Sequence, residues 1–181
     1  MADLISDRLE VDDDFEAVQE LYLERGWTDG LPIVPPTTER VEAMLAATPL
    51  NPQDIIGEIP PNWGSATVEK LAVNAVMAGC KPEYLPVVIA AVEAICDEVF
   101  NLYAIQATTH PCAPLIIVNG PICDELVLHG GSGAYGPGWQ PNATIGRAVR
   151  LAQLNVGGAR PGVGDMSTQG APSKYTYCVA E

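Results

Sequence analysis

The segment "PVVIAAVEAICDEVF", residues 86–100, constrains the fold most, because its residues are apolar on nearly every side of a helix. A helix of that kind is normally buried. Residues 65–79, just before it, place apolar side chains at helical spacing along one side only, which predicts a helix packed on one face. We therefore expect one buried helix and one helix packed on a single side within one domain over residues 1–181, a length that can enclose a core.

The remaining segments predict elements of both kinds. Helices are expected over 12–26, 38–48 and 142–156, and strands over 101–109, 114–120, 125–129 and 174–180, with a short extended piece at 55–56. Together they predict the α/β class: a mixed, layered single domain with a small, mixed sheet and four to five helices. Because the last strand pattern runs almost to Glu181 and strands need neighbours, we expect the fold to continue in another subunit or segment.

The negative net charge lies entirely in the first half of the sequence. Residues 1–99 hold 19 acids and 5 bases, whereas residues 100–181 hold 4 of each. This balance argues against nucleic acid and anionic membranes as partners, because both require a basic surface. The chain has no run of 18 apolar residues and no basic leader followed by an apolar core, which predicts a cytoplasmic protein. Its five cysteines are an odd number without pairing motifs, so free thiols are expected.

Cys80 stands between these two predicted helices and is followed by Lys81 and Pro82. Pro82 predicts a helix start just after the thiol. A helix N-terminus and a neighbouring lysine both lower the pKa of a thiol, so one interpretation makes Cys80 a catalytic nucleophile or redox thiol. The alternative is a small apolar side chain that packs at a turn.

His110 follows a predicted strand and is the candidate proton carrier, because imidazole titrates near neutral pH. A structural histidine is the alternative. His110, Cys112, Cys123 and His129 have the side chains of metal ligands, but their spacing matches no zinc finger or ribbon, so no metal site is expected. The sequence names no cofactor.

Two further segments carry polar side chains suited to a small substrate. In "PNATIGRAVR", Asn142 is a favourable N-cap, and Thr144 and Arg147 follow within the first turns, which predicts a site for an anionic group. The alternative makes the arginine a surface or subunit contact. In "WTDG", Trp27 and Asp29 are candidates for an aromatic wall and a carboxylate, although an Asp before Gly usually caps its own turn.

Five stretches together resemble an uncharacterised bacterial family: "GWTDGLPIVPPT", "AVNAVMAGCKPEYLPVVIAAVEA", "IVNGP", "NATIGRAVRL" and "KYTYCVAE". Members are fused to, or encoded beside, small UGSC-type (seleno)proteins, which bear a selenocysteine- or cysteine-Gly-Ser-Cys motif. The resemblance implies thiol- or selenol-linked chemistry in a two-part enzyme, and a second chain must supply that motif, because this chain lacks it. Asn119, in "IVNGP", joins the expected substrate-binding residues.

Two functions remain open. The first is a subunit of a small-molecule enzyme, of lyase, hydrolase or thiol-dependent reductase type, with Cys80 and His110 as catalytic residues and an anionic substrate. The second is a non-catalytic partner subunit that completes an active site on another chain.

Overall fold

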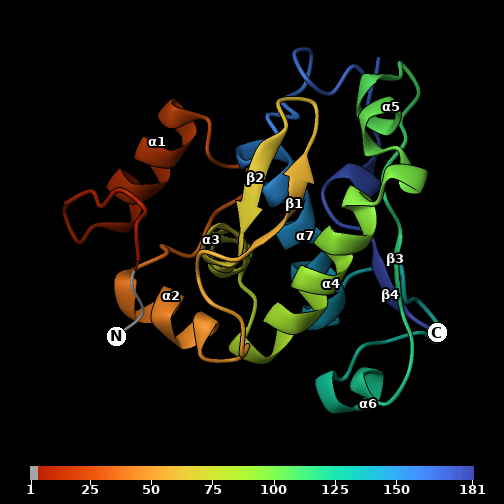
Figure 1. Ribbon diagram of the computed structural model, residues 1–181, viewed down its shortest axis with the longest axis horizontal. Helices are drawn as coiled ribbons and strands as arrows, with labels where there is room; N and C mark the ends of the chain where they lie inside the picture. The colour runs from red at the N-terminus through yellow and green to blue at the C-terminus, as the bar shows by residue number, and fades with distance from the viewer. Residues whose placement is uncertain (1–3) are drawn as a thin grey trace.

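The computed structural model describes residues 4–181 and confirms the mixed α/β class. The described residues form seven α-helices, more than the four to five expected, and two separate two-stranded sheets (Figure 1). In chain order, the elements are α1 (Phe15–Arg25), α2 (Thr38–Leu45), β1 (Ile55–Ile59), β2 (Gly64–Thr67), α3 (Val68–Ala78), α4 (Leu85–Cys96), α5 (Leu102–Ala107), β3 (Ile116–Val118), α6 (Ile122–Leu126), α7 (Gln140–Asn155) and β4 (Cys178–Ala180).

The centre of the molecule is the pair α3 and α7, which pack along each other, with α4 against both. The antiparallel hairpin β1–β2 covers α4 on one side, α2 packs against α3, and the parallel pair β3–β4 lies at the other end of the molecule (Figure 1). The core is built from side chains such as Leu71, Leu85, Ile145 and Leu151, all of which are fully buried. The helices predicted over 65–79, after Cys80 and over 142–156 are thus present as α3, α4 and α7.

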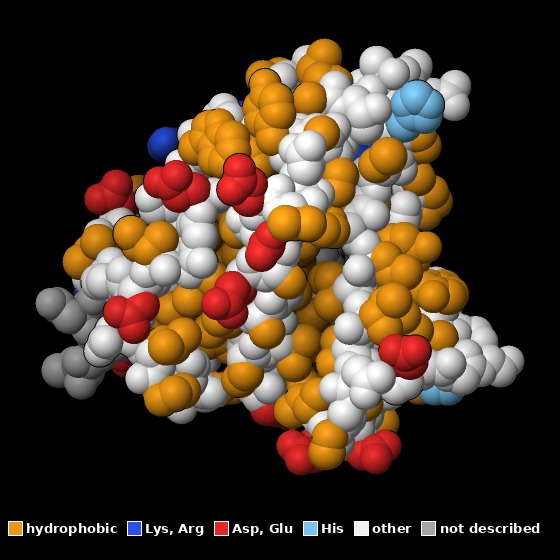
Figure 2. Space-filling view, turned by 45° about the vertical axis from the view of Figure 1, so that its right-hand side comes forward, with side chains coloured by type: hydrophobic (Ala, Val, Ile, Leu, Met, Phe, Trp, Pro, Cys, Tyr) orange, Lys and Arg blue, Asp and Glu red, His pale blue; other side chains and the backbone are white. Residues whose placement is uncertain are grey.

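The prediction that the segment 86–100 is buried on all sides is wrong. Helix α4 buries Leu85, Val88, Ile89, Val92 and Ile95 on one face, whereas its opposite face is exposed. Small residues and one glutamate occupy that exposed face. The sequence of the helix is therefore apolar on nearly every side, although only one face of the helix is buried. Figure 2 shows hydrophobic side chains reaching the surface at many places on this side of the molecule.

Two predicted strands are also wrong. Residues 102–107 form α5, because Asn101, with φ +54°, caps the helix by accepting a hydrogen bond from the backbone N–H of Ala104, and Gln106 donates to the buried side chain of Gln153. Residues 122–126 form α6, which ends where Val127 takes the left-handed conformation with φ +58°. In both cases tertiary contacts and caps override the β-propensity of the individual residues.

The predicted strands near 116 and 178 are present but short, three residues each, and they pair in parallel with Ile116 opposite Cys178. Side chains of alternate residues point to opposite faces of this sheet. Val118 and Cys178 face the core, whereas Ile117 is 56% exposed. In the described part of the chain, no helix is both long and apolar enough to cross a membrane.

Candidate functional site

Helix α7 and the loop before α2 are joined by one ion pair. Arg147 donates from Nε and Nη2 to the two carboxylate oxygens of Asp29, each bond being 2.8 Å long, and Nη2 also donates to the backbone carbonyl oxygens of Leu31 and Pro32. The side chains of Arg147 and Asp29 are only 14% and 6% exposed. The guanidinium that was expected to hold an anionic substrate therefore binds a carboxylate of its own chain.

The loop itself is folded around the same carboxylate. Asp29 accepts a hydrogen bond from the backbone N–H of Leu31, as in an Asx turn, and the Thr28 hydroxyl donates to the Leu31 carbonyl. Burial alone would raise the pKa of Asp29, but the hydrogen bonds and charge of Arg147 outweigh it and hold the pKa below its usual value. Asp29 is thus ionised at neutral pH, and both of its carboxylate oxygens accept hydrogen bonds from the chain.

Cys80 lies at the end of a helix rather than at the start of one. Gly79, with φ +87°, closes α3; its N–H donates to the Val76 carbonyl, and the N–H of Cys80 donates to the Ala75 carbonyl. This is a Schellman cap, and it places Cys80 beside the negative end of the α3 dipole. A 3₁₀ turn at Pro82–Tyr84 then separates the thiol from the first turn of α4.

The expectation of a lowered thiol pKa at Cys80 is wrong. Burial raises the pKa of the thiol to about 12, and the nearby Thr144 side chain and the charge of Arg147 lower it by less. Desolvation disfavours the thiolate, and no helix N-terminus compensates it. The thiol is consequently protonated near pH 7, which favours the interpretation of Cys80 as a packing residue in this chain.

Asn142 does not cap α7, because the helix begins two residues earlier, after Trp139. Its side chain is 95% buried and completes three hydrogen bonds: it accepts from the His129 N–H (2.9 Å) and donates to the His129 carbonyl (2.8 Å) and the Cys178 carbonyl (3.2 Å). Thr144 donates its hydroxyl proton to the Gln140 carbonyl one turn back. Asn142 therefore ties the segment before α7 to β4.

The predicted site residues divide into separate groups. Cys80, Thr144, Arg147 and Asp29 come together near the beginning of α7. His110 is not among them: Cys80 precedes α4, whereas His110 follows α5, beyond the far end of that helix (Figure 1). A helix of the length of α4 spans about 18 Å. His110 is exposed, with Nδ1 3.2 Å from the Thr108 hydroxyl, so the two proposed catalytic side chains share no site in this chain.

Trp27 and Asn119 occupy other places. Trp27 lies next to Tyr22, with ring centroids 5.5 Å apart, and its carbonyl accepts a hydrogen bond from Asn155. Asn119 follows β3 and donates to the Glu181 carboxylate at 3.2 Å. Trp27 lines one groove of the molecule, and the Glu181 to which Asn119 donates lines another.

One charged cluster was not assigned to a site from the sequence. The carboxylate of Asp165 binds the side chains of Arg150 (3.1 Å) and Lys174 (2.8 Å), and it also accepts from the Ser167 hydroxyl. Burial would raise the pKa of Asp165, yet these donors hold it below its usual value. The cluster fastens the glycine-rich loop of residues 157–170 to α7 and leaves neither arginine of α7 unpaired.

A groove of about 620 Å³ lies on the outer face of the β3–β4 pair. Its floor is formed by Ile117 and Val179, and the glycine-rich loop 130–136 with Tyr135 forms its wall. No further strand of residues 4–181 pairs with β4. The Ala180 N–H nevertheless donates to the His129 carbonyl, so the outer edge of β4 is already hydrogen-bonded at this residue. The β3 edge is different, because no further strand of residues 4–181 pairs with it.

In the described part of the chain, no three His, Cys, Asp or Glu side chains are grouped as ligands for a metal ion. The thiol of Cys123 donates to the Val118 carbonyl inside the core, and Cys112 is exposed. Comparisons of the chain with models of known protein families, with curated proteins and with solved structures found no match. The resemblance to the bacterial family therefore stays a prediction.

Proposed function

We propose that this chain is the non-catalytic partner subunit of a two-part small-molecule enzyme, and that it completes an active site on a second chain. The observation that carries the proposal is the β3–β4 pair. Parallel sheets are normally covered on both faces, and an exposed strand edge is a template for pairing with another chain. Here the outer face exposes Ile117, and β3 has no neighbour on its outer side in residues 4–181.

The hydrogen bonds between β3 and β4 determine which backbone groups at the outer edge of β3 remain unpaired. In a parallel ladder, alternate residues of a strand bond to the same neighbour. Ile116 donates to the Tyr177 carbonyl and Val118 accepts from Glu181, so the backbone N–H and carbonyl of Ile117 point away from β4. An extended segment of another protein can bond to them by strand addition.

The same position would bring a second chain over the groove between Ile117 and Tyr135 and next to Asn119. A thiol or selenol of that chain would supply the chemistry, and the groove and Asn119 would contact the substrate. This division of roles agrees with the protonated state of Cys80, whose pKa of about 12 makes it a poor nucleophile near neutral pH.

The test uses the full chain and a small UGSC-type protein as the proposed partner, each purified, with complex formation measured by sedimentation velocity. Ile117→Pro removes only the outward N–H, because a proline on the outer side of an edge strand costs no bond to β4. Ile117→Thr is the matched control that keeps the N–H and the β-propensity. We expect the proline variant to weaken association at least about tenfold and the threonine variant to retain it.

Iodoacetamide labelling of the same samples between pH 6 and 9 assigns the reactive thiol. We expect a thiol of the partner to be labelled first and Cys80 to stay unlabelled in the complex. Labelling of Cys80 below pH 8 in the complex would instead establish the catalytic interpretation, and equal association of both Ile117 variants would exclude the β3 edge as the contact.

A further inference from the structure

A small polar cavity lies between α7, the segment that leads from α5 to β3, and the turn that precedes β4. Its volume is about 20 Å³, which is room for one water-sized atom. Ile116 lines it, whereas Ile117 lines the groove described above, so the two lie on opposite faces of the β3–β4 pair. The cavity and the groove share no lining residue.

Two cations line this cavity and contact one carboxylate oxygen. Nη2 of Arg150 (3.1 Å) and Nζ of Lys174 (2.8 Å) both bind Oδ2 of Asp165, so the two charged groups lie side by side. Their side chains are only 11% and 12% exposed. The neighbouring charges cancel, because Arg147 is paired with Asp29. One positive charge is therefore left uncompensated beside the cavity.

The contacts of the two cations leave several of their protons unused. An ammonium group carries three protons and a guanidinium carries five. Lys174 donates to Asp165 alone, and Arg150 reaches its partners, Asp165 and the Ala159 carbonyl, only through Nη2. Among residues 4–181, the protons on Nε and Nη1 of Arg150 and two protons of Lys174 therefore have no acceptor.

Two buried amides line the same cavity. Gln106, on α5, donates from Nε2 to Oε1 of Gln153, on α7, and each side chain is only 2% exposed. In the described part of the chain this bond leaves Nε2 of Gln153 and Oε1 of Gln106 without a partner, and reversing both amides would again leave one donor and one acceptor.

These two free amide atoms are accessible. Among the described residues, the one side-chain atom that is both fully enclosed and without a partner is Oδ1 of Asn155, on the other side of the molecule. The free atoms of Gln106 and Gln153 are therefore not sealed in protein. Since both residues line the cavity, these atoms are at its surface.

This lining selects an occupant that accepts hydrogen bonds and carries a negative charge. Free N–H groups of Arg150, Lys174 and Gln153 outnumber the one free acceptor. A water molecule would accept some of these bonds but would leave the positive charge uncompensated. A carboxylate oxygen does both, and its hydrogen bonds to cationic donors are the stronger kind. The volume admits one such oxygen, so the rest of the ligand has to lie at the mouth of the cavity.

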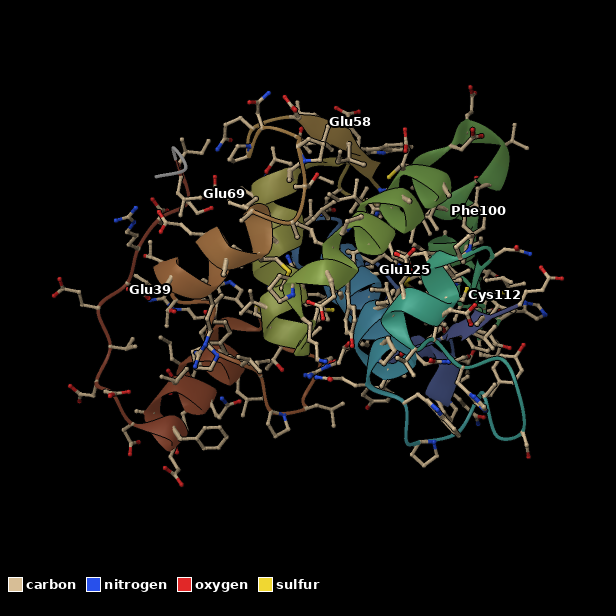
Figure 3. The ribbon with its side chains drawn as sticks, turned by 90° about the horizontal axis from the view of Figure 1, so that it is seen from below. Glu39, Glu58, Glu69, Phe100, Cys112 and Glu125 are labelled. Carbon is tan, nitrogen blue, oxygen red and sulfur yellow. The ribbon has the colours of Figure 1, made fainter. Side chains whose placement is uncertain are left out.

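The mouth is marked by Cys112, which lines the cavity and is exposed. In Figure 3 this residue lies at the periphery of the molecule, beside the C-terminal segment. A molecule that places a carboxylate oxygen in the cavity therefore brings its next carbon atoms toward the thiol.

We propose that Arg150, Lys174 and Gln153 bind one carboxylate oxygen of a small molecule in this cavity, with the rest of the molecule at the mouth beside the Cys112 thiol. The site lies beyond the function proposed above, because it shares no lining residue with the groove at β3–β4 and needs no second chain. The anion-binding role on α7 then belongs to Arg150, whereas Arg147 is occupied by Asp29.

Iodoacetate and iodoacetamide test the site, because they alkylate thiols in the same way and differ in charge. In both reactions the Cys112 sulfur forms a bond to the CH₂ carbon, iodide leaves, and the thiol proton passes to water. Peptide mass spectrometry gives the two rate constants at Cys112, in the folded chain and in concentrated urea, at pH 7.5 and constant ionic strength. We expect the ratio of the iodoacetate to the iodoacetamide rate constant to be at least about tenfold higher in the folded chain, because a bound carboxylate holds the carbon near the thiol.

Sodium acetate is the competing ligand, and sodium chloride at the same concentration is its control. We expect acetate to slow the iodoacetate reaction at Cys112 saturably and to leave the iodoacetamide reaction unchanged. A ratio that is equal in the folded and unfolded chains, or an iodoacetate rate that acetate does not change, would mean that the cavity holds water only and would overturn the proposal.

Two lysine substitutions place the effect in the cavity. Lys174→Gln removes the uncompensated charge, whereas Lys81→Gln removes the same charge at an exposed position outside the lining. We expect Lys174→Gln to lose the preference for iodoacetate and Lys81→Gln to keep it. Equal preferences in the two variants would contradict the role of Lys174. Asp165 keeps Arg150 and the Ser167 hydroxyl in Lys174→Gln, and a melting curve checks its fold. If that variant does not fold, the acetate competition on the wild-type chain still decides.

Discussion

The guanidinium of Arg147, on α7, holds the carboxylate of Asp29, 118 residues earlier in the chain, through two hydrogen bonds of 2.8 Å. The pair is almost excluded from solvent. It explains why a proline- and glycine-rich loop keeps one shape, and why the cation expected to bind a substrate is already neutralised. The loop and the helix are therefore held as one unit.

We expect Asp29→Asn to lower the free energy of unfolding by about 3 kcal/mol, because removing one partner leaves a buried, uncompensated charge. Urea unfolding at pH 7, followed by circular dichroism, measures the change. Asp12→Asn is the control, since residue 12 is exposed, and its effect should stay within about 0.5 kcal/mol. A loss below about 1 kcal/mol for Asp29→Asn would mean that water already screens the pair.

The pH dependence of stability should report the same carboxylate. The pKa of Asp29 is held below its ordinary value in the folded chain, so its contribution is fully present above the unfolded pKa of about 3.9 and is lost as the pH falls through the lower folded pKa. The difference between wild type and Asp29→Asn should therefore shrink as the pH is lowered from 6 to 3. A difference that stays constant over this range would show that Asp29 titrates alike in both states.

Local patterns predicted the long helices but not the short helices α5 and α6. The period of apolar residues in 142–156 is enough to predict most of α7, because one face of that helix enters the core. Residues 101–109 carry β-forming side chains, but the helix there depends on a cap at Asn101 and on Gln106 bonding to a residue 47 positions away. A single sequence contains no signal for such a distant partner.

The same limit applies to Cys80 and Arg147. Pro82 does precede helical residues, yet the helix that controls the thiol is the one that ends at Gly79, and a glycine followed by cysteine was the available signal for that cap. The Asp29–Arg147 pair joins residues that no local pattern connects. Asn142 was predicted to cap its own helix, but its partners are backbone groups of His129 and Cys178.

Thiol labelling should separate the cysteines by burial. Cys112 is exposed, whereas burial raises the pKa of Cys80 and of Cys178 to about 12. In the isolated chain at pH 7.5, we expect iodoacetamide to modify Cys112 at least about tenfold faster than Cys80, because the thiolate is the reactive form. Peptide mass spectrometry over time measures both rates in one sample. Preferential labelling of Cys80 would show that its thiol is both accessible and ionised.

Two polar residues of α7, Asn142 and Thr144, have very different hydrogen-bond partners. Asn142→Ala leaves the Cys178 carbonyl and the His129 N–H without their partner, in a place that is almost closed to water, whereas the His129 carbonyl keeps the Ala180 N–H. We expect the free energy of unfolding to fall by about 3 kcal/mol, the sum of two unsatisfied buried groups. Thr144→Ala removes one hydroxyl that bonds back to its own helix, which adds little stability, so its cost should remain below about 1 kcal/mol. Urea unfolding of both variants gives the comparison. Equal losses for the two would contradict the role of Asn142 as the link between the segment at His129 and β4.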